Sequence, residues 1–372
     1  MIHDGLVYEI AFAHYRNITL DTARHFADKG IGPADFFTKS AGTLAACTGI
    51  KSSFFDDARR KAALESALAE KRFIDSSTVI PCFYTDPLYP ARLAECNDAP
   101  AMLYMAGTAA AAAAMYSVAI VGTRHCTAYG ADFTKRLVSD MAEAFGSVLV
   151  VSGLAYGIDI CAHRAAMDAG LPTAAVLAHG LNTVYPAEHR QDARRIASSG
   201  GFVASEYRSS DSIHRGNFLA RNRIVAGLAD VTIVVESDIK GGAMATARIA
   251  GEYNRDVMAL PGRINDAYSR GCNHLIATRA ASVIRGVDDL VEITGWQPRP
   301  KAGEQQQLRF EMPAAYAAVL EALKECPDAT VNDLCVRLSL PYASLSSTLF
   351  QMEMDDYIIA LPGGRYTLPA RQ

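Results

Sequence analysis

The chain has 372 residues, of which 50% are hydrophobic and 20% are charged. This composition excludes a disordered protein, and the length predicts two or three domains with a substantial core. The formal net charge of −4 excludes a surface covered by a general nucleic-acid-binding field.

The eight cysteines are scattered, with no C-x-x-C pair and no Cys/His spacing typical of a metal site. The first residues lack the basic region and apolar core of a secretory signal. We therefore expect a cytoplasmic protein with reduced thiols and no bound metal. The uncharged stretch 99–123 is long enough to span a bilayer, but it is rich in alanine and ends in a strand pattern, so we predict no membrane partner.

Residues 1–78 are predicted to form a small helical domain, because apolar positions recur at helical spacing in 6–15, 20–27 and 54–68. A plain helical bundle, of the SAM type, is the favoured interpretation. The run Lys29-Gly30-Ile31-Gly32 keeps a helix–hairpin–helix open as an alternative. Residues 79–107 contain four prolines that are typical of an irregular, wrapped connector.

From residue 118 onward, apolar runs alternate with helical stretches, which predicts an α/β fold with an extended Rossmann-like parallel sheet. We assign residues 79–296 to this domain. Such a sheet binds ligands at the carboxyl ends of its strands. The predicted strands cover 118–121, 148–151, 173–177, 202–204, 231–235 and 257–260.

Residues 297–310 are predicted to be a polar linker, and residues 311–372 a winged helix with three helices before a hairpin. The helices are expected at 314–325, 330–338 and 341–354, with Pro341 as the first residue of the third, and the strands at 357–360 and 365–368. The third helix has no Lys or Arg, and residues 313–372 hold four basic against seven acidic side chains. We therefore predict that this module contacts protein rather than DNA.

Two glycine-containing turns follow the first two predicted parallel strands. The turn after the first strand contains Gly122, Thr123 and Arg124. Free backbone amides at the start of the following helix would favour a phosphate beside the Arg124 guanidinium. Ser152 and Gly153 end the second, so both turns are expected to border one crevice. Neither turn has the Gly-x-Gly-x-x-Gly spacing of a dinucleotide site, so we predict no NAD and no other cofactor.

Two further segments are candidates for the same crevice. The first is rich in cations around an aromatic ring, which suits phosphates and stacked bases: Arg215, Phe218, Arg221, Asn222 and Arg223. The alternative is a structural helix start whose arginines pair with Glu206 and Asp211, with Phe218 in the core. The second segment, Lys240-Gly241-Gly242, offers another amide cluster beside a cation.

No catalytic set emerges from the sequence. Glu236 at a strand end suits an N-glycosidase-type enzyme, but it equally suits a helix cap or an ion pair with Arg. Asp159 and His163 lie four residues apart, and a local side-chain hydrogen bond is favoured over an acid/base pair. We therefore interpret the site as one for binding, without enzymatic turnover.

Taken in order, these segments resemble the bacterial DNA-processing protein A family, also called Smf, over residues 89–283. The motifs that carry the resemblance are Ile-Val-Gly-Thr-Arg…Tyr-Gly, Ser-Gly-Leu-Ala-Tyr-Gly-Ile-Asp…Ala-His, Tyr185-Pro186, Ser205-Glu206-Tyr207, Phe-x-x-Arg-Asn-Arg, Leu260-Pro261-Gly262 and Gly271-Cys272-Asn273-x-Leu-Ile. The resemblance implies a protein that binds single-stranded DNA without sequence preference, protects it, and loads the recombinase RecA during natural transformation. It also implies a homodimer, and a single-strand-binding protein is a further expected partner.

By this resemblance, Arg124 occupies the position of a phosphate-contacting arginine and Phe218 that of an aromatic residue associated with a base. Arg215 stands where the family often has Lys. The sequence departs from the family at two places. Leu219 stands where the family usually has Pro, and Gly242-Ala243-Met244 stands where the family has Ser-Gly followed by an apolar residue.

Two other functions remain open from the sequence. A phosphoribohydrolase on a related scaffold would use Glu236 and an Arg, but its Pro-Gly-Gly-x-Gly-Thr-x-x-Glu signature is absent. A sensing module would bind a small phosphate ligand in the same crevice. Affinity that rises with strand length distinguishes a DNA-binding protein from both.

Overall fold

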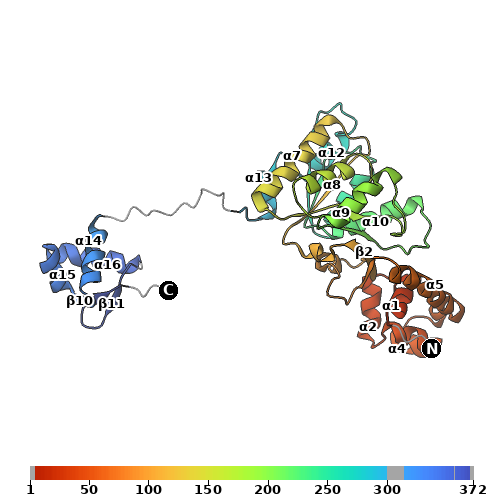
Figure 1. The fold of residues 1–372 in the computed structure, drawn as a ribbon, viewed down its shortest axis with the longest axis horizontal. Coiled ribbons are helices and arrows are strands. Elements are labelled where there is room, and N and C mark those ends of the chain that lie inside the picture. The colour runs from red at the N-terminus through yellow and green to blue at the C-terminus, as the bar shows by residue number, and fades with distance from the viewer. Residues whose placement is uncertain (1–4, 300–313, 356, 369–372) are drawn as a thin grey trace. The chain divides into compact units, whose positions relative to one another are not determined.

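The computed structural model describes residues 5–299, 314–355 and 357–368. The chain divides into two compact units, residues 1–299 and residues 300–372 (Figure 1). The boundary predicted at 78/79 stays a prediction, because the helical and Rossmann-like parts belong to one unit. The boundary predicted at 296/297 also stays a prediction.

The N-terminal part of the first unit is helical, as predicted. Its helices are α1 (Gly5–His14), α2 (Leu20–Asp28), α3 (Pro33–Thr38), α4 (Ala41–Thr48) and α5 (Asp57–Asp75), with the short 3-10 helix η1 (Ser52–Phe55) before α5. Side chains of Thr19, Ser40 and Asp56 cap α2, α4 and α5. A fully buried cluster of phenylalanine rings, mostly packed edge to face, forms the core: Phe12, Phe26, Phe36 and Phe55.

A nine-stranded sheet dominates the rest of this unit, in the order β1-β2-β6-β5-β4-β3-β7-β8-β9. All neighbours from β6 to β9 are parallel, which confirms the predicted Rossmann-like sheet. The strands are β1 (Ile80–Phe83), β2 (Met102–Gly107), β3 (Ser117–Val121), β4 (Leu149–Ser152), β5 (Thr173–Val176), β6 (Phe202–Ser205), β7 (Val231–Val234), β8 (Asp256–Ala259) and β9 (Ser282–Val283).

The prediction of an irregular connector over residues 79–107 is wrong. These residues contain β1, the short helix α6 (Ala91–Ala94) and β2, and these strands extend the sheet through the antiparallel pairs β1–β2 and β2–β6. Pro81 is tolerated because β1 is an edge strand, where a missing N–H leaves no neighbour unpaired.

Within the described residues, no helix is long and apolar enough to cross a membrane. The stretch 99–123 is instead β2, the 3-10 helix η2 (Ala109–Ala113) and β3.

Helices cover both faces of the sheet, as alternation along the strands requires. In β4, Val150 packs in one core with α7 (Ala128–Phe145), α8 (Ile158–Asp168) and α13 (Val287–Thr294). Its neighbour Val151 packs in the other core with α10 (Arg215–Gly227), α11 (Gly242–Glu252) and α12 (Arg270–Ala277). The helix α9 (Arg190–Ser198) packs over β5 and β6.

The second unit is a winged helix, as predicted. It comprises α14 (Ala314–Glu325), β10 (Ala329–Thr330), α15 (Val331–Leu338), α16 (Tyr342–Met354), β11 (Ile359–Leu361) and β12 (Arg365–Thr367). Pro341 is the N-cap of α16 rather than its first residue. The hairpin gains a third strand, because β10 pairs with β12. From residue 300 on, the predicted linker lies outside the described residues.

Candidate nucleic-acid interface

The carboxyl ends of β3 and β7 mark the point where the strand order reverses. From β3 the chain builds outward through β4, β5 and β6, and then returns to β7 on the other side of β3. A parallel sheet opens a crevice at such a point. The Thr123 N–H donates to the Glu236 carbonyl oxygen (2.6 Å), and the Ile158 N–H donates to the Thr123 carbonyl oxygen (3.2 Å). The turn after β3 is therefore held between the turns after β7 and β4.

Two glycines make this close approach possible. A Cβ on Gly122 would lie 2.5 Å from the Ile158 side chain and 3.0 Å from the Glu236 carbonyl oxygen. Gly157 has φ +74°, and a Cβ there would collide with the backbone of Thr123 and Arg124. Sequence reasoning identified Gly122 but not Gly157, whose requirement depends on a contact between two separate turns.

Arg124, Phe218 and Tyr185 meet beside this turn. The exposed guanidinium of Arg124 lies 5.7 Å from the centroid of the Phe218 ring, within the range of a cation–π contact. The Tyr185 ring packs edge to face against Phe218, with centroids 5.7 Å apart and planes at 67°. Tyr185 is 48% exposed. A cation and two aromatic rings thus reach one surface from segments that follow β3, β5 and β6.

Tyr185 was missed as a functional residue, although its Tyr-Pro pair is among the family motifs. Its signal was an aromatic side chain in a loop at the carboxyl edge. Arg215, at the first position of α10, is exposed and precedes Phe218 by one helical turn.

The side chains of Ser152 and Arg221 lie beneath the surface, which does not favour the prediction that these two residues border the ligand directly. The Ser152 hydroxyl is fully buried and donates to the Ile120 carbonyl oxygen (2.6 Å). Arg221 is 5% exposed and donates to the Val176 carbonyl oxygen. Its guanidinium fills the space that a Cβ on Gly153 would need. These residues support the crevice from within.

Asp159 supports the same turn. Its carboxylate accepts the N–H groups of Gly153 (3.2 Å) and Ala155 (3.4 Å). Burial raises the pKa of Asp159, and the nearby Arg221 guanidinium opposes that change. Burial in turn lowers the pKa of Arg221.

The favoured hydrogen bond between Asp159 and His163 is wrong, because each side chain has other partners. His163 is fully buried and shares a 2.7 Å hydrogen bond between its Nδ1 and the Thr173 hydroxyl. Burial lowers the pKa of His163 to about 3, so the ring is neutral at physiological pH. A neutral histidine within the core is part of the packing.

Arg223 pairs with a carboxylate, although the sequence placed it among the candidates for ligand contact. It forms a 2.6 Å ion pair with Glu206, and both side chains are largely buried. The structural alternative therefore holds for Arg223, although Asp211 pairs with Arg208 instead. Asn222 is half-buried, and its Nδ2 donates to the Gly242 carbonyl oxygen (3.4 Å), which links α10 to the turn after β7.

The third turn presents Lys240, Gly241 and Gly242 at the start of α11. Lys240 is exposed. A Cβ on Gly241 would collide with the Ser237 hydroxyl, whereas Gly242 faces open space. Among the described residues, no side chain caps the N-terminus of α11, so its first amides have no side-chain acceptor. The departure from the family at 242–244 thus preserves an open helix start.

Glu236 has a structural role. It is 3% exposed, and its carboxylate accepts the N–H of Thr127 (2.9 Å) and the Thr127 hydroxyl at the start of α7. The cap and the helix dipole favour this carboxylate where it lies. Each of its oxygens accepts a hydrogen bond at the start of α7, which fits the helix-cap alternative for this residue. In the described part of the chain, no group of three or more His, Cys, Asp or Glu side chains can hold a metal ion.

A cavity of about 940 Å³ extends the crevice beyond β7. It lies between the first turn of α7 and the loop after β8. Tyr129, Arg263 and Tyr268 contribute to its lining, and the Tyr129 hydroxyl donates to the Pro261 carbonyl oxygen (2.9 Å). The candidate features therefore lie along the carboxyl edge from β6 to β8.

Comparison with known proteins decides the family. Residues 81–295 match the family model described as DNA recombination-mediator protein A. The chain belongs to this family. Residues 299–364 match a second model, the DprA winged helix domain, in agreement with the fold of the second unit. The resemblance seen in the order of the motifs is thus confirmed, and a role in DNA processing follows from family membership.

Relatives from distant bacteria support this assignment. The putative DNA processing protein DprA of Mycobacterium tuberculosis is 37% identical over 271 residues, which cover 71% of this chain and 68% of that protein. The DNA processing protein DprA of Streptococcus pneumoniae is 38% identical over 207 residues, which cover 56% of this chain and 72% of that protein.

Two solved structures share the fold. The crystal structure of DprA from Streptococcus pneumoniae aligns with a TM-score of 0.61 and 28% identity, over 75% of this chain and 99% of that chain. A structure that describes the single-stranded DNA binding mode of DNA processing protein A from Helicobacter pylori aligns with a TM-score of 0.51 and 32% identity. This alignment covers 55% of this chain and 92% of that chain.

The contact between the two turns can be tested by substitution of glycine. We expect Gly157→Ala to lower the free energy of unfolding by at least about 1 to 2 kcal/mol, because it places a side chain at positive φ against the Thr123 carbonyl. Gly242→Ala is the control, since its Cβ would have no heavy atom within 4 Å. Urea unfolding measures both changes, and equal stability of the two variants would contradict the packing described here.

Proposed function

We propose that this protein binds single-stranded DNA along the carboxyl edge of its sheet, without sequence preference and without enzymatic turnover. The observation that carries the proposal is the meeting of Arg124 with the Phe218 and Tyr185 rings. A cation beside two aromatic surfaces matches a phosphate beside a splayed base. The named binding mode of the Helicobacter pylori relative supports the same ligand.

The predicted residues fall into two groups in this proposal. Those at the surface are the candidates for direct contact: Gly122, Thr123, Arg124, Arg215, Phe218, Lys240, Gly241 and Gly242. Ser152, Gly153, Arg221, Asn222 and Arg223 support them from below or behind. Phosphates and stacking surfaces provide the contacts, and these carry no sequence information.

The two other functions have less support. Glu236 is 3% exposed and accepts two hydrogen bonds at the start of α7, which supports a helix cap over the carboxylate role that a phosphoribohydrolase would need. A small-ligand sensor requires one enclosed site, whereas the features here are spread along the edge from β6 to β8. Because each added nucleotide reaches another of these features, affinity should rise with strand length and should not saturate with a mononucleotide.

Salt dependence tests the direct role of Arg124. We expect Arg124→Ala to weaken binding of a poly-dT strand of about 20 nucleotides and to lower the slope of log affinity against log salt by about 0.7, because one phosphate contact is lost. Fluorescence anisotropy over a salt series measures both quantities. The matched control is Arg136→Ala, which removes an exposed arginine that lies 5.8 Å from the Phe133 ring centroid on α7.

Phe218→Leu completes this experiment. It should weaken binding by about 1 to 3 kcal/mol through lost stacking while the salt slope stays unchanged. If Arg124→Ala has the slope and affinity of the wild-type protein, Arg124 is not part of the site.

We further propose that the bound strand is protected and passed to the recombinase RecA during natural transformation, with a homodimer as the working form. A cytoplasmic location fits this role, as do the eight unpaired cysteines. The support for these steps is family membership, and a single-strand-binding protein is the expected competitor for the strand.

RecA loading can be measured on a strand coated with single-strand-binding protein. We expect the full chain to shorten the lag before RecA assembles, as followed by DNA-dependent ATP hydrolysis, because it holds the strand accessible to RecA. Arg124→Ala should lose this effect in proportion to its loss of affinity. An unchanged lag at saturating protein would rule out loading.

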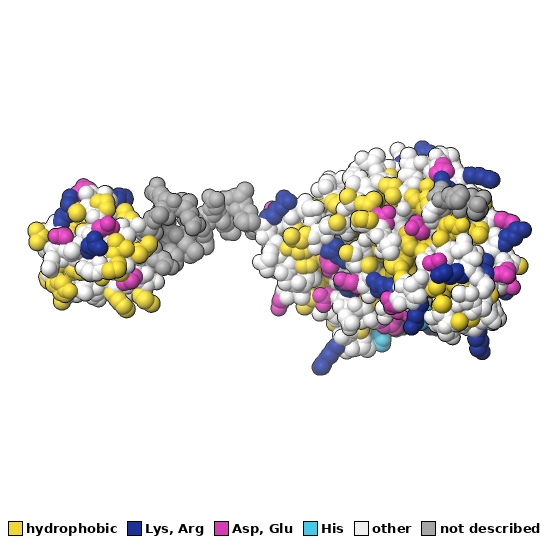
Figure 2. All heavy atoms as spheres, turned by 90° about the horizontal axis from the view of Figure 1, so that it is seen from below, with side chains coloured by type: hydrophobic (Ala, Val, Ile, Leu, Met, Phe, Trp, Pro, Cys, Tyr) yellow, Lys and Arg dark blue, Asp and Glu magenta, His cyan; other side chains and the backbone are white. Residues whose placement is uncertain are grey.

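We also propose that the winged helix contacts protein rather than DNA. Its helix α16 carries no Lys or Arg, and hydrophobic side chains gather on the surface of this unit (Figure 2). Phe350 and Met354 on α16 are 62% and 68% exposed, and Val336 on α15 is 83% exposed. Exposed apolar side chains of this size are typical of protein-binding surfaces.

Truncation tests this second role. A chain that ends at Arg299 retains the compact first unit. We expect its affinity for single-stranded DNA to stay within about twofold of the full chain at equal salt, because no cation of the crevice is removed. A collapse of affinity would assign DNA contacts to the winged helix.

A further inference from the structure

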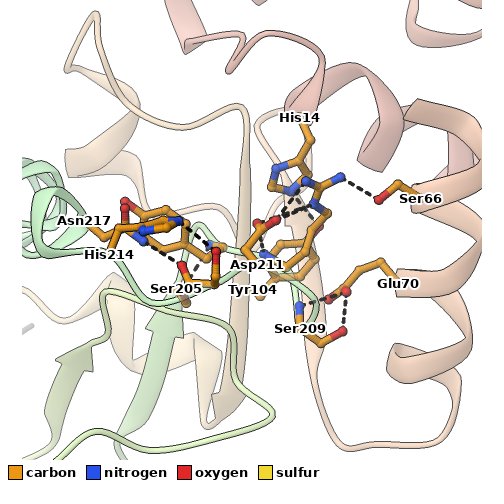
Figure 3. Close-up of polar contacts among 12 residues, drawn as sticks. His14, Ser66, Glu70, Tyr104, Ser205, Ser209, Asp211, His214 and Asn217 are labelled. Carbon is orange, nitrogen blue, oxygen red and sulfur yellow. Dashed lines mark hydrogen bonds and ion pairs between the residues drawn. The ribbon is translucent and has the colours of Figure 1, made fainter. Parts of the chain in front are cut away.

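The loop from 206 to 214 connects the sheet to the segment that carries Arg215 and Phe218. It begins after β6 and ends where α10 starts. On its way it lies against α1, α5 and β2, as the close-up of its polar contacts shows (Figure 3). The N-terminal helices thus contact the loop that leads directly to the proposed DNA-binding residues.

Glu70 of α5 forms the first part of this contact. Its side chain is 3% exposed, and one carboxylate oxygen accepts both the Ser209 N–H (2.9 Å) and the Ser209 hydroxyl. Both donors belong to one loop residue, so loss of this carboxylate leaves two polar groups without an acceptor. Ser209 is half-buried, so loss of this acceptor costs part of the free energy of an unpaired buried group, and the carboxylate holds the loop at Ser209.

Arg208 forms the second part. Its Nη1 donates to the Ser66 hydroxyl of α5 (2.7 Å), while its Nη2 donates to Asp211 (2.8 Å). The Arg208 N–H also donates to the Asp211 carboxylate (2.8 Å), so the loop is folded back on itself. The Arg208 carbonyl lies against Gly180, where a Cβ would collide with it. At this point the loop backbone lies directly against the backbone of Gly180.

His14 and Tyr104 form the wall behind this ion pair. His14 Nε2 lies 3.0 Å from the Tyr104 hydroxyl, and the two rings stack with planes at 8°. Burial, reinforced by Arg208, lowers the pKa of His14 to about 3, so the ring is neutral. At the other end of the loop, Asn217 Nδ2 donates to the Ala178 carbonyl oxygen (3.2 Å).

From these contacts we infer that the N-terminal helices position the DNA-binding start of α10, with Glu70 and Arg208 as positioning residues that touch no DNA themselves. The inference rests on the proposed function. If the loop is already ordered in the free protein, binding of the strand does not have to supply the conformational entropy cost of ordering the loop. The affinity is then higher without any new contact. The N-terminal helices therefore contribute to strand binding from behind the crevice.

Amide hydrogen exchange in the free protein tests the clamp without DNA. We expect Glu70→Ala to speed exchange across 206–218 about tenfold, because Ser209 loses its acceptor. Glu70→Gln keeps a carbonyl oxygen as acceptor and should restore slow exchange. Glu65→Ala, at an exposed position of the same helix, is the control. Ser66→Ala, which removes the partner of Arg208, repeats the test if Glu70→Ala does not fold. Unchanged exchange in a folded variant overturns the inference.

A double-mutant cycle then links the clamp to DNA. Glu70→Ala should lower affinity for poly-dT about tenfold in the wild-type background. It should lower affinity much less in a Phe218→Ala background, because coupled residues are not additive. Equal losses in the two backgrounds overturn the inference, since Glu70 would not act through this segment. If the wild-type protein does not bind the strand, the proposed function fails, and the exchange measurement alone decides the clamp.

Discussion

The backbone hydrogen bond from the Thr123 N–H to the Glu236 carbonyl oxygen ties the turns after β3 and β7 together where the sheet order reverses. Glu236 also caps α7 through its carboxylate, so one residue fixes both the turn and the helix that follows it. The absence of a side chain at Gly122 allows this approach. The position of Arg124 depends on all three features, and the interface is therefore defined by backbone geometry before any side chain takes part.

The sheet brings together groups that no single segment contains. The cation comes from the turn after β3, one ring from the loop after β5 and the other ring from the helix after β6. Buried charged side chains lie beneath this surface. The burial of Asp159 and Arg221 is tolerated because each contacts backbone groups or an opposite charge. A rigid core thus supports a polar, open edge. This division suits a ligand with a regular backbone and variable bases.

The sequence predicted the parallel strands and the winged helix well, because runs such as 118–121 and the pattern of 314–325 depend on local periodicity. It failed at β1 and β2, where Pro81 argued against a strand that an edge position tolerates. It placed Arg221 and Arg223 with Arg124, since spacing along a helix does not reveal which arginine meets Val176 or Glu206. Gly157, Tyr185 and Glu70 were missed because their roles arise from contacts between distant segments.

The stacking of Arg124 on Phe218 has a consequence for the protein before it meets DNA. In the free state the guanidinium partly covers a ring that would otherwise face water. Such masking reduces the tendency of an aromatic surface to adhere to other molecules. A nucleotide that bound as proposed would replace this internal partner, and the guanidinium and the ring would then become available to it together. In the free protein this ring is therefore neither buried in the core nor bare to water, because the proposed phosphate-binding cation lies against it.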